Sequence, residues 1–505
     1  MSSSPVAEVR LSSAGRAEIF LAVRNALKLG ASLVCTWGIA LAVRLLVPRY
    51  LGPDTFGELT FADGFTATFF VALTLGMDLY IRREVSTRLE HAAEFFGGVL
   101  AVRVAITAVL FVVMAAVMEL THRSPQVRAL VYLFGAAQFF MSMNGTLSAI
   151  LHAAGRVDGL SIIAAVTKLV WAGGCATAIC FGTGLWVFPA SVLAGEVIES
   201  AVLYALARRH ARLLFRVDWT ATRRALSAAL PFYLNAAAYL AYSRLDVSLL
   251  AMLAGDREVG WYGAAQTFSG LTMALTPLLA WVYMPLLARA AGRSREEFYE
   301  LLRRELEYTL AAAIPLSAAV SLGADLWISL AFGDRFAPAA YALRFLGPMA
   351  AVTYVAFVVA ACATLLESGW RLTLVSVLGL PVNVALNLTL IPLGLRALGP
   401  AGGGGAGAAL AAFGTELFVA AAMLWTIGRK AIDRRVLVTT GKLLGVCAAV
   451  AAMDLVVSSL APVRRVALDA VAFLGLALLL RAVDLQAIAG FVRAAVKERR
   501  AGIAE

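Results

Sequence analysis

The sequence is poor in charge and in the residues that build metal and disulfide sites. Only 15% of its 505 residues are charged, whereas 61% are hydrophobic, and the mean hydropathy is +0.83. This balance excludes a soluble globular protein and indicates a polytopic membrane protein. The cysteines lie inside apolar stretches without paired spacing, so neither a disulfide framework nor a metal site is expected. The four histidines fall at the ends of these stretches or in loops, which argues against a catalytic role.

Lysine is scarce, with five among the 43 basic residues, and the net charge of +11 comes almost entirely from arginine. Most of the excess lies in loops. A chain that lines the inner face of a membrane explains this placement better than nucleic-acid binding does, so no nucleic-acid partner is expected.

Apolar stretches of about 20 residues predict an all-α polytopic fold with 14 transmembrane helices. Their expected limits are 26–48, 57–81, 94–118, 128–150, 159–181, 184–206, 227–252, 260–287, 308–332, 338–365, 371–395, 404–427, 436–459 and 465–483. Arginine and lysine gather in alternate loops, at 82–88, 208–224, 289–304 and 429–435. By the positive-inside rule, both termini of this multi-pass protein face the cytoplasm, and the membrane is the cytoplasmic (inner) one.

One short turn occurs twice. Gly-Pro-Asp-Thr-Phe-Gly at residues 52–57 matches Gly-Asp-Arg-Glu-Val-Gly at 255–260 in glycine spacing, and each follows an apolar span with an arginine near its end. A weaker echo pairs 151–156 with 365–371. Two bundles of one plan are typical of secondary transporters. The sequence therefore predicts two six-helix lobes related by an internal repeat, with two appended C-terminal helices.

The expected domains follow from this repeat. They are a disordered N-terminus (1–17), an N-lobe (18–206), a cytoplasmic linker (207–226), a C-lobe (227–428), and an appended pair of helices with a cytoplasmic tail (429–505). The segment 293–307 reads as an amphipathic helix that extends the ninth span. The glycines at 402–405, with Gly407, predict a flexible outer turn rather than a phosphate-binding loop.

A polar stripe runs along the seventh span. Asn235, Tyr239, Tyr242 and Asp246 follow helical spacing, and Arg244 lies beside them. Lipid cannot satisfy such a stripe, so it must face protein or water. An aqueous chamber inside a helical bundle is therefore expected.

Other ionisable residues lie inside the predicted spans: Arg44, Asp63, Asp78, Arg103, Lys168, Glu196, Glu199, Arg344, Glu416, Lys442 and Asp454. Each would cost roughly 2.5–3.5 kcal/mol at the bilayer centre. They must pair with one another or line a wet chamber. Residues near span ends, such as Arg44 and Arg344, can instead reach the interface, and Lys168 can form a structural ion pair with Glu196. Asn383 and Asn387 fit either interhelical hydrogen bonding or chamber lining.

The chain resembles the Wzx-type polysaccharide-lipid flippases of the multidrug/oligosaccharidyl-lipid/polysaccharide (MOP) superfamily. The resemblance covers most of the chain and is carried by Arg-Tyr-Leu-Gly-Pro-Asp-Thr-Phe-Gly at 49–57 and by Ser-Arg-Leu-Asp-Val-Ser-Leu-Leu with Gly-Asp-Arg-Glu-Val-Gly-Trp-Tyr within 243–262. It implies two lobes around a central chamber that opens alternately to each side. It also implies a substrate, a glycan linked to undecaprenyl pyrophosphate, carried to the outer leaflet for a cell-surface polysaccharide such as an O-antigen.

The resemblance also implies functional residues. Arg44 and Arg244 match positions beside the two repeat turns, and Asp246 belongs to the Arg-x-Asp pattern of the family. Arg103, Lys168 and Arg344 join them only as intramembrane cations that suit a pyrophosphate. Asn235, Tyr239 and Tyr242 suit glycan hydroxyls.

A carboxylate at Asp246, Glu196 or Glu416 can carry a coupling proton or Na⁺. No cofactor is expected besides such an ion, and other polysaccharide-assembly proteins are expected as partners.

Three other functions remain open. A multidrug exporter of the same superfamily would favour carboxylates for organic cations. A membrane glycosyltransferase or polysaccharide polymerase would need catalytic residues in a substantial outer loop, and the predicted outer loops are short, so an enzyme is not expected. A scaffold would not need so many charges inside the membrane.

Overall fold

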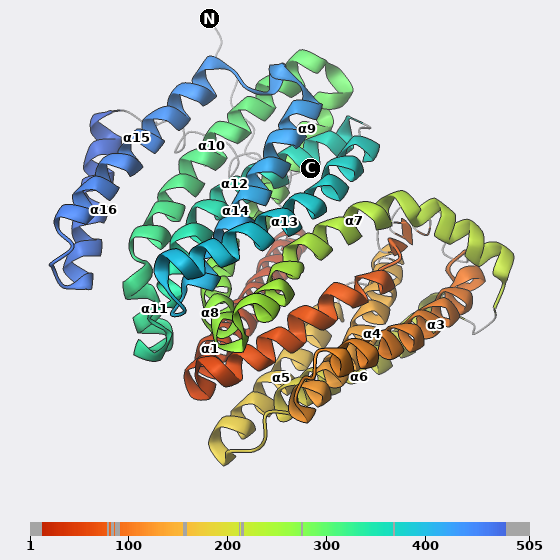
Figure 1. The fold of residues 1–505 in the computed structure, drawn as a ribbon. Helices are drawn as coiled ribbons and strands as arrows, with labels where there is room; N and C mark the ends of the chain where they lie inside the picture. The colour runs from red at the N-terminus through yellow and green to blue at the C-terminus, as the bar shows by residue number, and fades with distance from the viewer. Residues whose placement is uncertain are drawn as a thin grey trace, which may run out of the picture.

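The computed structural model describes residues 13–77, 80–81, 85, 91–154, 159–211, 213, 217–273, 276–366 and 369–480. Within these residues all regular elements are helices (Figure 1). Eight of them are long and apolar enough to cross a membrane, or up to nine if the bent pair α10 (Arg295–Leu322) and α11 (Ala324–Phe332) is one span. The expectation of an all-helical, multi-span membrane protein is confirmed.

The N-terminal half forms one group of helices, coloured red to yellow in Figure 1. It contains α1 (Ser13–Phe70), α3 (His91–Leu120), α4 (Pro125–Ala153), α5 (Leu160–Phe181) and α6 (Val187–Ala211). In this group α6 packs between α4 and α5, and α1 packs against the same two helices. The long helix α7 (Trp219–Ala254) contacts α1 and α3 on one side and α13 on the other, so it joins the two halves.

The C-terminal half forms the second group, coloured green to blue in Figure 1. It contains α8 (Asp256–Thr272), α9 (Thr276–Arg293), the pair α10–α11, α12 (Ala339–Leu365), α13 (Gly369–Leu398) and α14 (Gly403–Ile427). In it α14 packs against both α12 and α13. The last two helices, α15 (Arg434–Val456) and α16 (Pro462–Leu479), lie at the edge of the molecule against α10.

Polar residues at the expected places start several helices. The side chains of Ser124, Ser294 and Asp433 each accept a hydrogen bond from the backbone N–H three residues ahead, at 3.3, 3.1 and 3.0 Å. These are N-caps, which satisfy donors that a helix start leaves unpaired. Apolar helices therefore begin where short polar residues interrupt the hydrophobic run.

The first two predicted spans run into each other as α1, with a sharp break at Gly52, whose φ of 76° and ψ of 169° are not helical. The predicted turn is thus a kink between two directly joined helices. Helix α1 already begins at Ser13, so residues 13–17 of the segment expected to be disordered (1–17) are helical. Residues 1–12 lie outside the described part of the chain.

Three other predictions need correction. The span expected at 260–287 is interrupted after Met273, and α9 restarts at Thr276 with Pro277 in its first turn, where proline is tolerated because no helical N–H is lost. The span expected at 308–332 bends by 69° at Gly323. The linker expected over 207–226 is shorter, because α6 runs to Ala211 and α7 begins at Trp219.

The glycine-rich stretch after residue 402 is not a flexible turn. Gly403 to Gly407 form the first turn and a half of α14 and are buried. A Cβ added at Gly407 would lie 2.2 Å from the carbonyl oxygen of Leu390, and one at Gly403 would lie 2.5 Å from that of Gly394. These glycines let α14 touch the backbone of α13, so their role is close packing.

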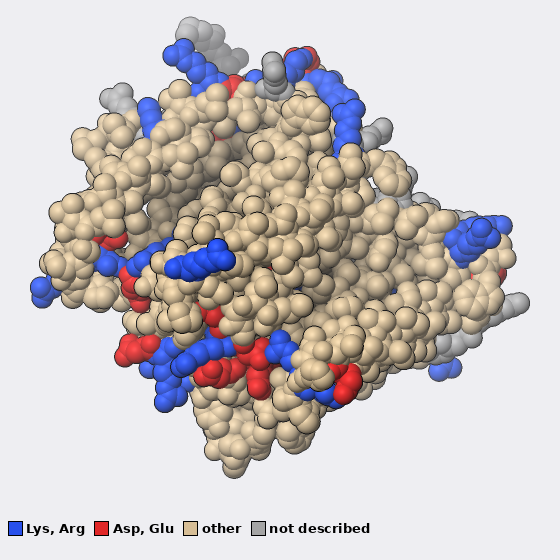
Figure 2. Space-filling model, viewed as in Figure 1, with Lys and Arg blue, Asp and Glu red and all other residues tan. Residues whose placement is uncertain are grey.

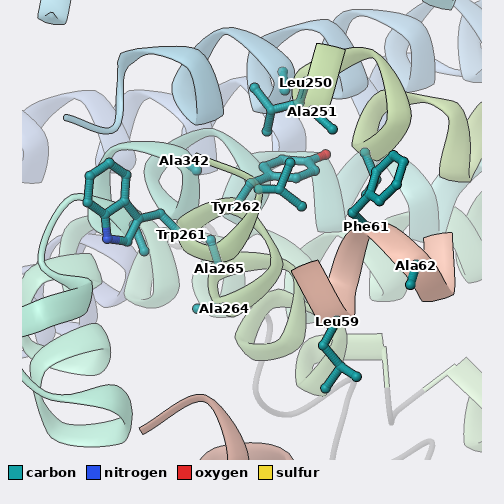
Figure 3. Close-up of a cluster of buried hydrophobic side chains, with 14 of the residues drawn as sticks. Leu59, Phe61, Ala62, Leu250, Ala251, Trp261, Tyr262, Ala264, Ala265 and Ala342 are labelled. Atoms are coloured by element: carbon teal, nitrogen blue, oxygen red, sulfur yellow. The ribbon is translucent and has the colours of Figure 1, made fainter. Parts of the chain in front are cut away.

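The buried apolar side chains show where the two halves meet. One cluster combines residues from both halves, for example Phe61 and Phe65 of α1 with Tyr262 of α8 (Figure 3). Toward the arginine-rich end the clusters are separate. One is built around Phe95 of the first half, and another is built around Phe298 of the second. The cluster around Phe95 also includes Ala225 and Ala229 at the start of α7, so at this end the first group of helices packs against α7.

Candidate functional site

The two repeated turns pack directly against each other. A Cβ added at Gly57 would lie 1.8 Å from the carbonyl oxygen of Asp256, and one at Gly260 would lie 1.9 Å from that of Pro53. Gly57 and Gly260 hold the same place in their turns, and so do Pro53 and Asp256, so the contact is reciprocal. Gly255 has φ 88° and ψ 171°, close to the values at Gly52.

Ion pairs surround this contact at the same end of the molecule. The guanidinium Nη1 of Arg123, between α3 and α4, lies 2.7 and 2.8 Å from the two carboxylate oxygens of Asp256. The Arg123 guanidinium also lies 4.2 Å over the ring of Phe61. Gln126 donates to Glu58 at 3.0 Å. Figure 2 shows a mixed group of acidic and basic side chains in the lower part of an otherwise mostly uncharged face.

Glu258 ties the turn to α14. Its side chain is 2% exposed, and its two carboxylate oxygens accept hydrogen bonds of 2.7 Å from the backbone N–H groups of Gly402 and Gly405. Burial raises the pKa of the Glu258 carboxyl, and these N–H groups oppose that rise. Nearby, the indole Nε1 of Trp261 donates to the carbonyl oxygen of Arg335 at 3.0 Å. Helices α1, α4, α8 and α14 are thus held together at this end.

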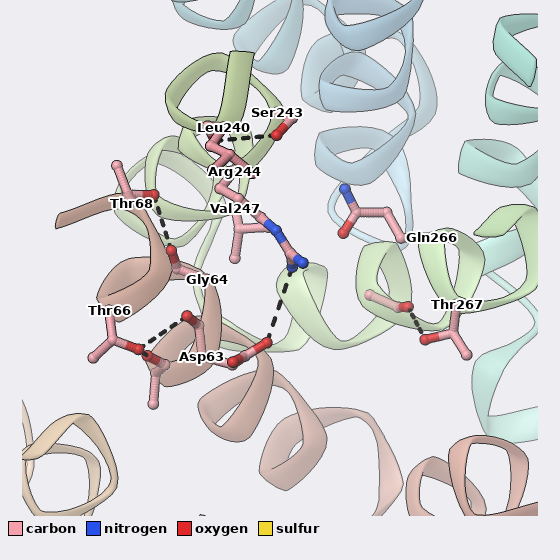
Figure 4. Close-up of polar contacts among 12 residues, drawn as sticks. Asp63, Gly64, Thr66, Thr68, Leu240, Ser243, Arg244, Val247, Gln266 and Thr267 are labelled. Carbon is pink, nitrogen blue, oxygen red and sulfur yellow. Dashed lines mark hydrogen bonds and ion pairs between the residues drawn. The ribbon is translucent and has the colours of Figure 1, made fainter. Parts of the chain in front are cut away.

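Beyond the shared core, charged side chains from both halves meet on α1 and α7. Nη1 of Arg244 lies 3.9 Å from Oδ2 of Asp63, and the two side chains are 48% and 45% exposed (Figure 4). Arg44 is also exposed and acts electrostatically on the Asp63 carboxylate. Arg44 precedes Gly52 by eight residues and Arg244 precedes Gly255 by eleven. The difference is about one helical turn, so the two arginines hold similar positions on their helices.

Asp246 lies next to this group but is buried. It is 2% exposed and accepts hydrogen bonds from its neighbour Val247 N–H at 2.8 Å, from the hydroxyl of Tyr262, and from Nε2 of Gln266 at 3.3 Å. Because three donors already satisfy it, Asp246 holds α7 against α8 in this conformation.

Sequence reasoning did not include Asp63 and Gln266 among the site residues. Asp63 follows Gly52 by eleven residues, and Gln266 follows Gly255 by the same number. The repeat therefore carried a signal for both positions. In the structure one pairs with Arg244 and the other with Asp246.

Two other polar residues of α7, Tyr239 and Tyr242, contact each other. Tyr239 is 36% exposed, and its ring meets that of the buried Tyr242 edge-on, with centroids 5.4 Å apart. Glu416 of α14 is 5% exposed and is near enough to both tyrosines to act on them electrostatically. The side chain of Asn235 lies outside the described residues.

Two predicted site residues form contacts within the N-terminal half. Arg103 is 2% exposed, and its Nε donates to the carbonyl oxygen of Leu73 at 2.9 Å. Glu196 accepts a hydrogen bond from Nδ2 of Asn144 at 2.9 Å. Lys168 is exposed and acts electrostatically on the Glu196 carboxylate, without a direct ion pair among the described residues.

Arg344 lies in a different charge network. Its Nη2 is 2.7 Å from Oδ2 of Asp325, which also accepts from Arg465 of α16 at 2.7 Å. Arg465 in turn reaches Asp454 of α15 at 2.9 Å. This network joins α11 and α12 to the last two helices, so Arg344 does not belong with Arg44 and Arg244.

Among the described residues no group of three or more histidine, cysteine, aspartate or glutamate side chains could hold a metal ion.

Asn383 and Asn387 are buried, and Asn383 donates to Oγ1 of Thr415 on α14 at 3.2 Å. Of the two uses left open for Asn383, the structure thus shows interhelical hydrogen bonding.

Comparison with known proteins identifies the fold. The structure of a lipid II flippase, MurJ, in an inward closed conformation matches with a TM-score of 0.71 at 12% identity, covering 90% of this chain and 99% of that one. An inward-facing multidrug resistance transporter of the MATE family matches with a TM-score of 0.61 at 16% identity, covering 76% and 94%. A MOP superfamily transporter from Pyrococcus furiosus matches with a TM-score of 0.53 at 15% identity, covering 78% and 96%. Comparison with curated proteins gives no match.

These matches define the class: the fold is that of the MOP superfamily of membrane transporters. The family model described as polysaccharide biosynthesis protein matches residues 22–291, more than half of the chain. The chain belongs to this family, and the resemblance recognised in the sequence is confirmed at this level.

Proposed function

We propose that this protein is a flippase that moves a glycan linked to an undecaprenyl-pyrophosphate-type lipid across the cytoplasmic membrane for cell-surface polysaccharide synthesis. The observation that carries the proposal is the group formed by Arg44, Asp63 and Arg244. This group joins α1 to α7 and combines charges of both halves. The Arg244 and Asp63 side chains remain about half exposed, although they lie within predicted membrane spans.

The chemistry of this group suits a pyrophosphate. Arginine forms bidentate, charge-assisted hydrogen bonds with phosphate oxygens. In the structure Arg244 makes only a loose contact of 3.9 Å with Asp63. A half-exposed pair of this kind contributes between 0 and about 1 kcal/mol. A pyrophosphate can therefore replace Asp63 as the partner of Arg244 at little cost, and Asp63 can take Arg244 back on release.

The architecture suits alternating access. We place 14 spans in two six-helix lobes with an appended pair and with both termini in the cytoplasm. The reciprocal contact of the two glycine turns supports such a repeat, because equivalent residues meet as across a two-fold axis. The shared apolar core and the Arg123–Asp256 pair close the outer end, while at the arginine-rich end the cores around Phe95 and Phe298 are distinct and α7 contributes to both.

Resetting the chamber after release requires a coupling ion, which we propose to be a proton or Na⁺. Asp246 and Glu416 are buried carboxyls; Asp246 holds α7 to α8, and Glu416 lies near Tyr239 and Tyr242 of α7. Glu196 remains a candidate in the N-terminal half, beside Asn144. Tyr239 is exposed enough to meet glycan hydroxyls, and other polysaccharide-assembly proteins are the expected partners.

A second candidate function is export of organic cations. The observation in its favour is the pair of buried carboxyls Asp246 and Glu416, which suit a cationic drug, in a fold shared with MATE transporters. The exposed arginines speak against it, because they would repel such a substrate.

Reconstitution separates the two functions. Purified protein in proteoliposomes is given either a fluorescent undecaprenyl-pyrophosphate-linked oligosaccharide, whose arrival in the other leaflet is followed by quenching, or a fluorescent organic cation under an ion gradient. We expect movement of the lipid-linked glycan and no accumulation of the cation. Accumulation of the cation without glycan movement would favour the exporter and reject the flippase.

A further inference from the structure

A second basic site lies on the second half of the molecule, away from the Arg44–Arg244 group. A pocket of about 560 Å³ opens where α10 and α13 begin and α14 ends. Its lining includes Arg295 and Tyr299 of α10, Trp370 and Arg371 of α13, and Thr426 of α14. By the distribution of loop arginines, this is the cytoplasmic end.

The two arginines of this pocket have no acidic partner in the described part of the chain. Arg295 and Arg371 are exposed and form no ion pair with another described residue. Two nearby arginines are different: Arg293 at the end of α9 pairs with Glu297 at 2.7 Å, and Arg304 of α10 pairs with Glu300. The pocket thus holds two positive charges that the described residues leave uncompensated.

The backbone adds to this positive field. Helix α10 starts at Arg295 and α13 starts at Gly369, so two helix N-termini adjoin the pocket. At the start of α10 the N-cap Ser294 accepts from one N–H group, that of Glu297, and both helices direct the positive end of their dipole toward the pocket. Tyr299 is held in place because its hydroxyl donates to the carbonyl oxygen of Ile427 at 2.9 Å. The result is a shaped, positively charged recess suited to a phosphate group.

The rim of the pocket is apolar. Trp370 is 64% exposed, and Leu366 is part of the lining. Exposed tryptophan is enriched where a membrane protein crosses the lipid headgroup region. An apolar rim beside two arginines matches a ligand that carries a phosphate and a hydrocarbon part, and basic pockets between helices on the cytoplasmic side bind anionic lipid headgroups.

We infer that this pocket binds the phosphate headgroup of an anionic phospholipid from the adjoining leaflet, with Arg295 and Arg371 on the phosphate and Trp370 against the glycerol and acyl region. This site is separate from the proposed transport site, so its occupancy does not depend on the flippase assignment.

The test uses the full-length protein purified in a neutral detergent. Its apparent melting temperature is followed while short-chain phosphatidylglycerol, phosphatidylcholine with the same chains, or inorganic phosphate is added. The pocket variant carries R295Q and R371Q. The matched control carries R208Q and R209Q, which neutralise two adjacent exposed arginines near the end of α6.

We expect phosphatidylglycerol to stabilise the wild type and the control variant, with phosphatidylcholine and inorganic phosphate far less effective. In the pocket variant, the concentration of phosphatidylglycerol needed for half the effect should rise about 30-fold, since each arginine near an anionic headgroup contributes about 1 kcal/mol. Equal phosphatidylglycerol titrations for wild type and pocket variant would overturn the inference. Stabilisation by inorganic phosphate alone to the same extent would also overturn it.

Discussion

Loss of the Arg123–Asp256 pair should open the end of the molecule that we propose to face outward. In this pair one guanidinium nitrogen, Nη1 of Arg123, contacts both carboxylate oxygens of Asp256; the two side chains are only 15% and 28% exposed, and the pair joins the start of α4 to the start of α8. Charge-assisted hydrogen bonds in such surroundings contribute about 2 kcal/mol. If this contact exists only in the outer-closed state, Arg123→Gln should raise the outer-open population about 30-fold relative to the closed one.

The opening can be read by thiol labelling. Ser243 directly precedes Arg244 on α7 and is partly exposed. A Ser243→Cys reporter in a background without the five native cysteines is exposed to a membrane-impermeant maleimide from outside the cell. The labelling rate follows the outer-open population, so the Arg123→Gln variant should label about 30 times faster than the parent. The exchange variant Arg123→Asp with Asp256→Arg should return the rate toward that of the parent.

A second pair at the same end supplies the control. Arg257 and Asp54 also connect the two turns, but at 3.6 Å and with side chains 62% and 70% exposed. An exposed pair of this kind contributes between 0 and about 1 kcal/mol, so Arg257→Gln should change the labelling rate by less than about fivefold. The reasoning is refuted if Arg123→Gln and Arg257→Gln give the same labelling rates.

The other predictions concern stability, read as the apparent melting temperature of the purified protein. Gly57→Ala should lower the melting temperature by several degrees, because the added Cβ would lie 1.8 Å from the backbone oxygen of Asp256, an overlap that costs about 3 kcal/mol. The control Gly441→Ala, at an open position of α15, should raise the melting temperature slightly. Equal effects of the two substitutions would contradict the close-contact argument. Glu258→Gln should also lower the melting temperature, because one of the N–H groups of Gly402 and Gly405 would face an amide N–H₂ instead of an oxygen, at a cost of about 1–3 kcal/mol. An unchanged melting temperature would show that these two hydrogen bonds to Glu258 are not needed for stability.

Much of the fold could be predicted because its helices are long and apolar. The limits of α12, α13 and α14 agree with the expected spans to within a few residues. The repeated turn located Gly52 and Gly255, whose positive φ values make glycine the suitable residue there. These features are local, so the sequence carries them directly.

The predictions that were wrong concern features that depend on contacts between distant segments. A run of glycines such as 403–407 is typical of a turn, and only the approach of α13 shows that it is a helix packed without side chains. The bend at Gly323 has the same cause, since hydropathy alone predicts one continuous span.

The candidate site was predicted in part for a similar reason. The spacing placed Arg44 and Arg244 beside the repeat turns, and the structure shows both near Asp63. Arg344 was grouped with them because it is an intramembrane cation, but its partner Asp325 lies on another helix, which spacing cannot show. Repeat-equivalent positions are thus a better guide to this site than charge alone.

The most direct test of the central claim is translocation of the pyrophosphate-linked glycan by the Arg244→Gln variant in proteoliposomes. The substitution removes the positive charge while keeping much of the length of the side chain, and it breaks only a loose, half-exposed pair. The account predicts a fall in the transport rate of about 10- to 100-fold, as lost charge-assisted bonds to phosphate imply, with Arg344→Gln close to wild type as the control. Full transport by Arg244→Gln would contradict the account.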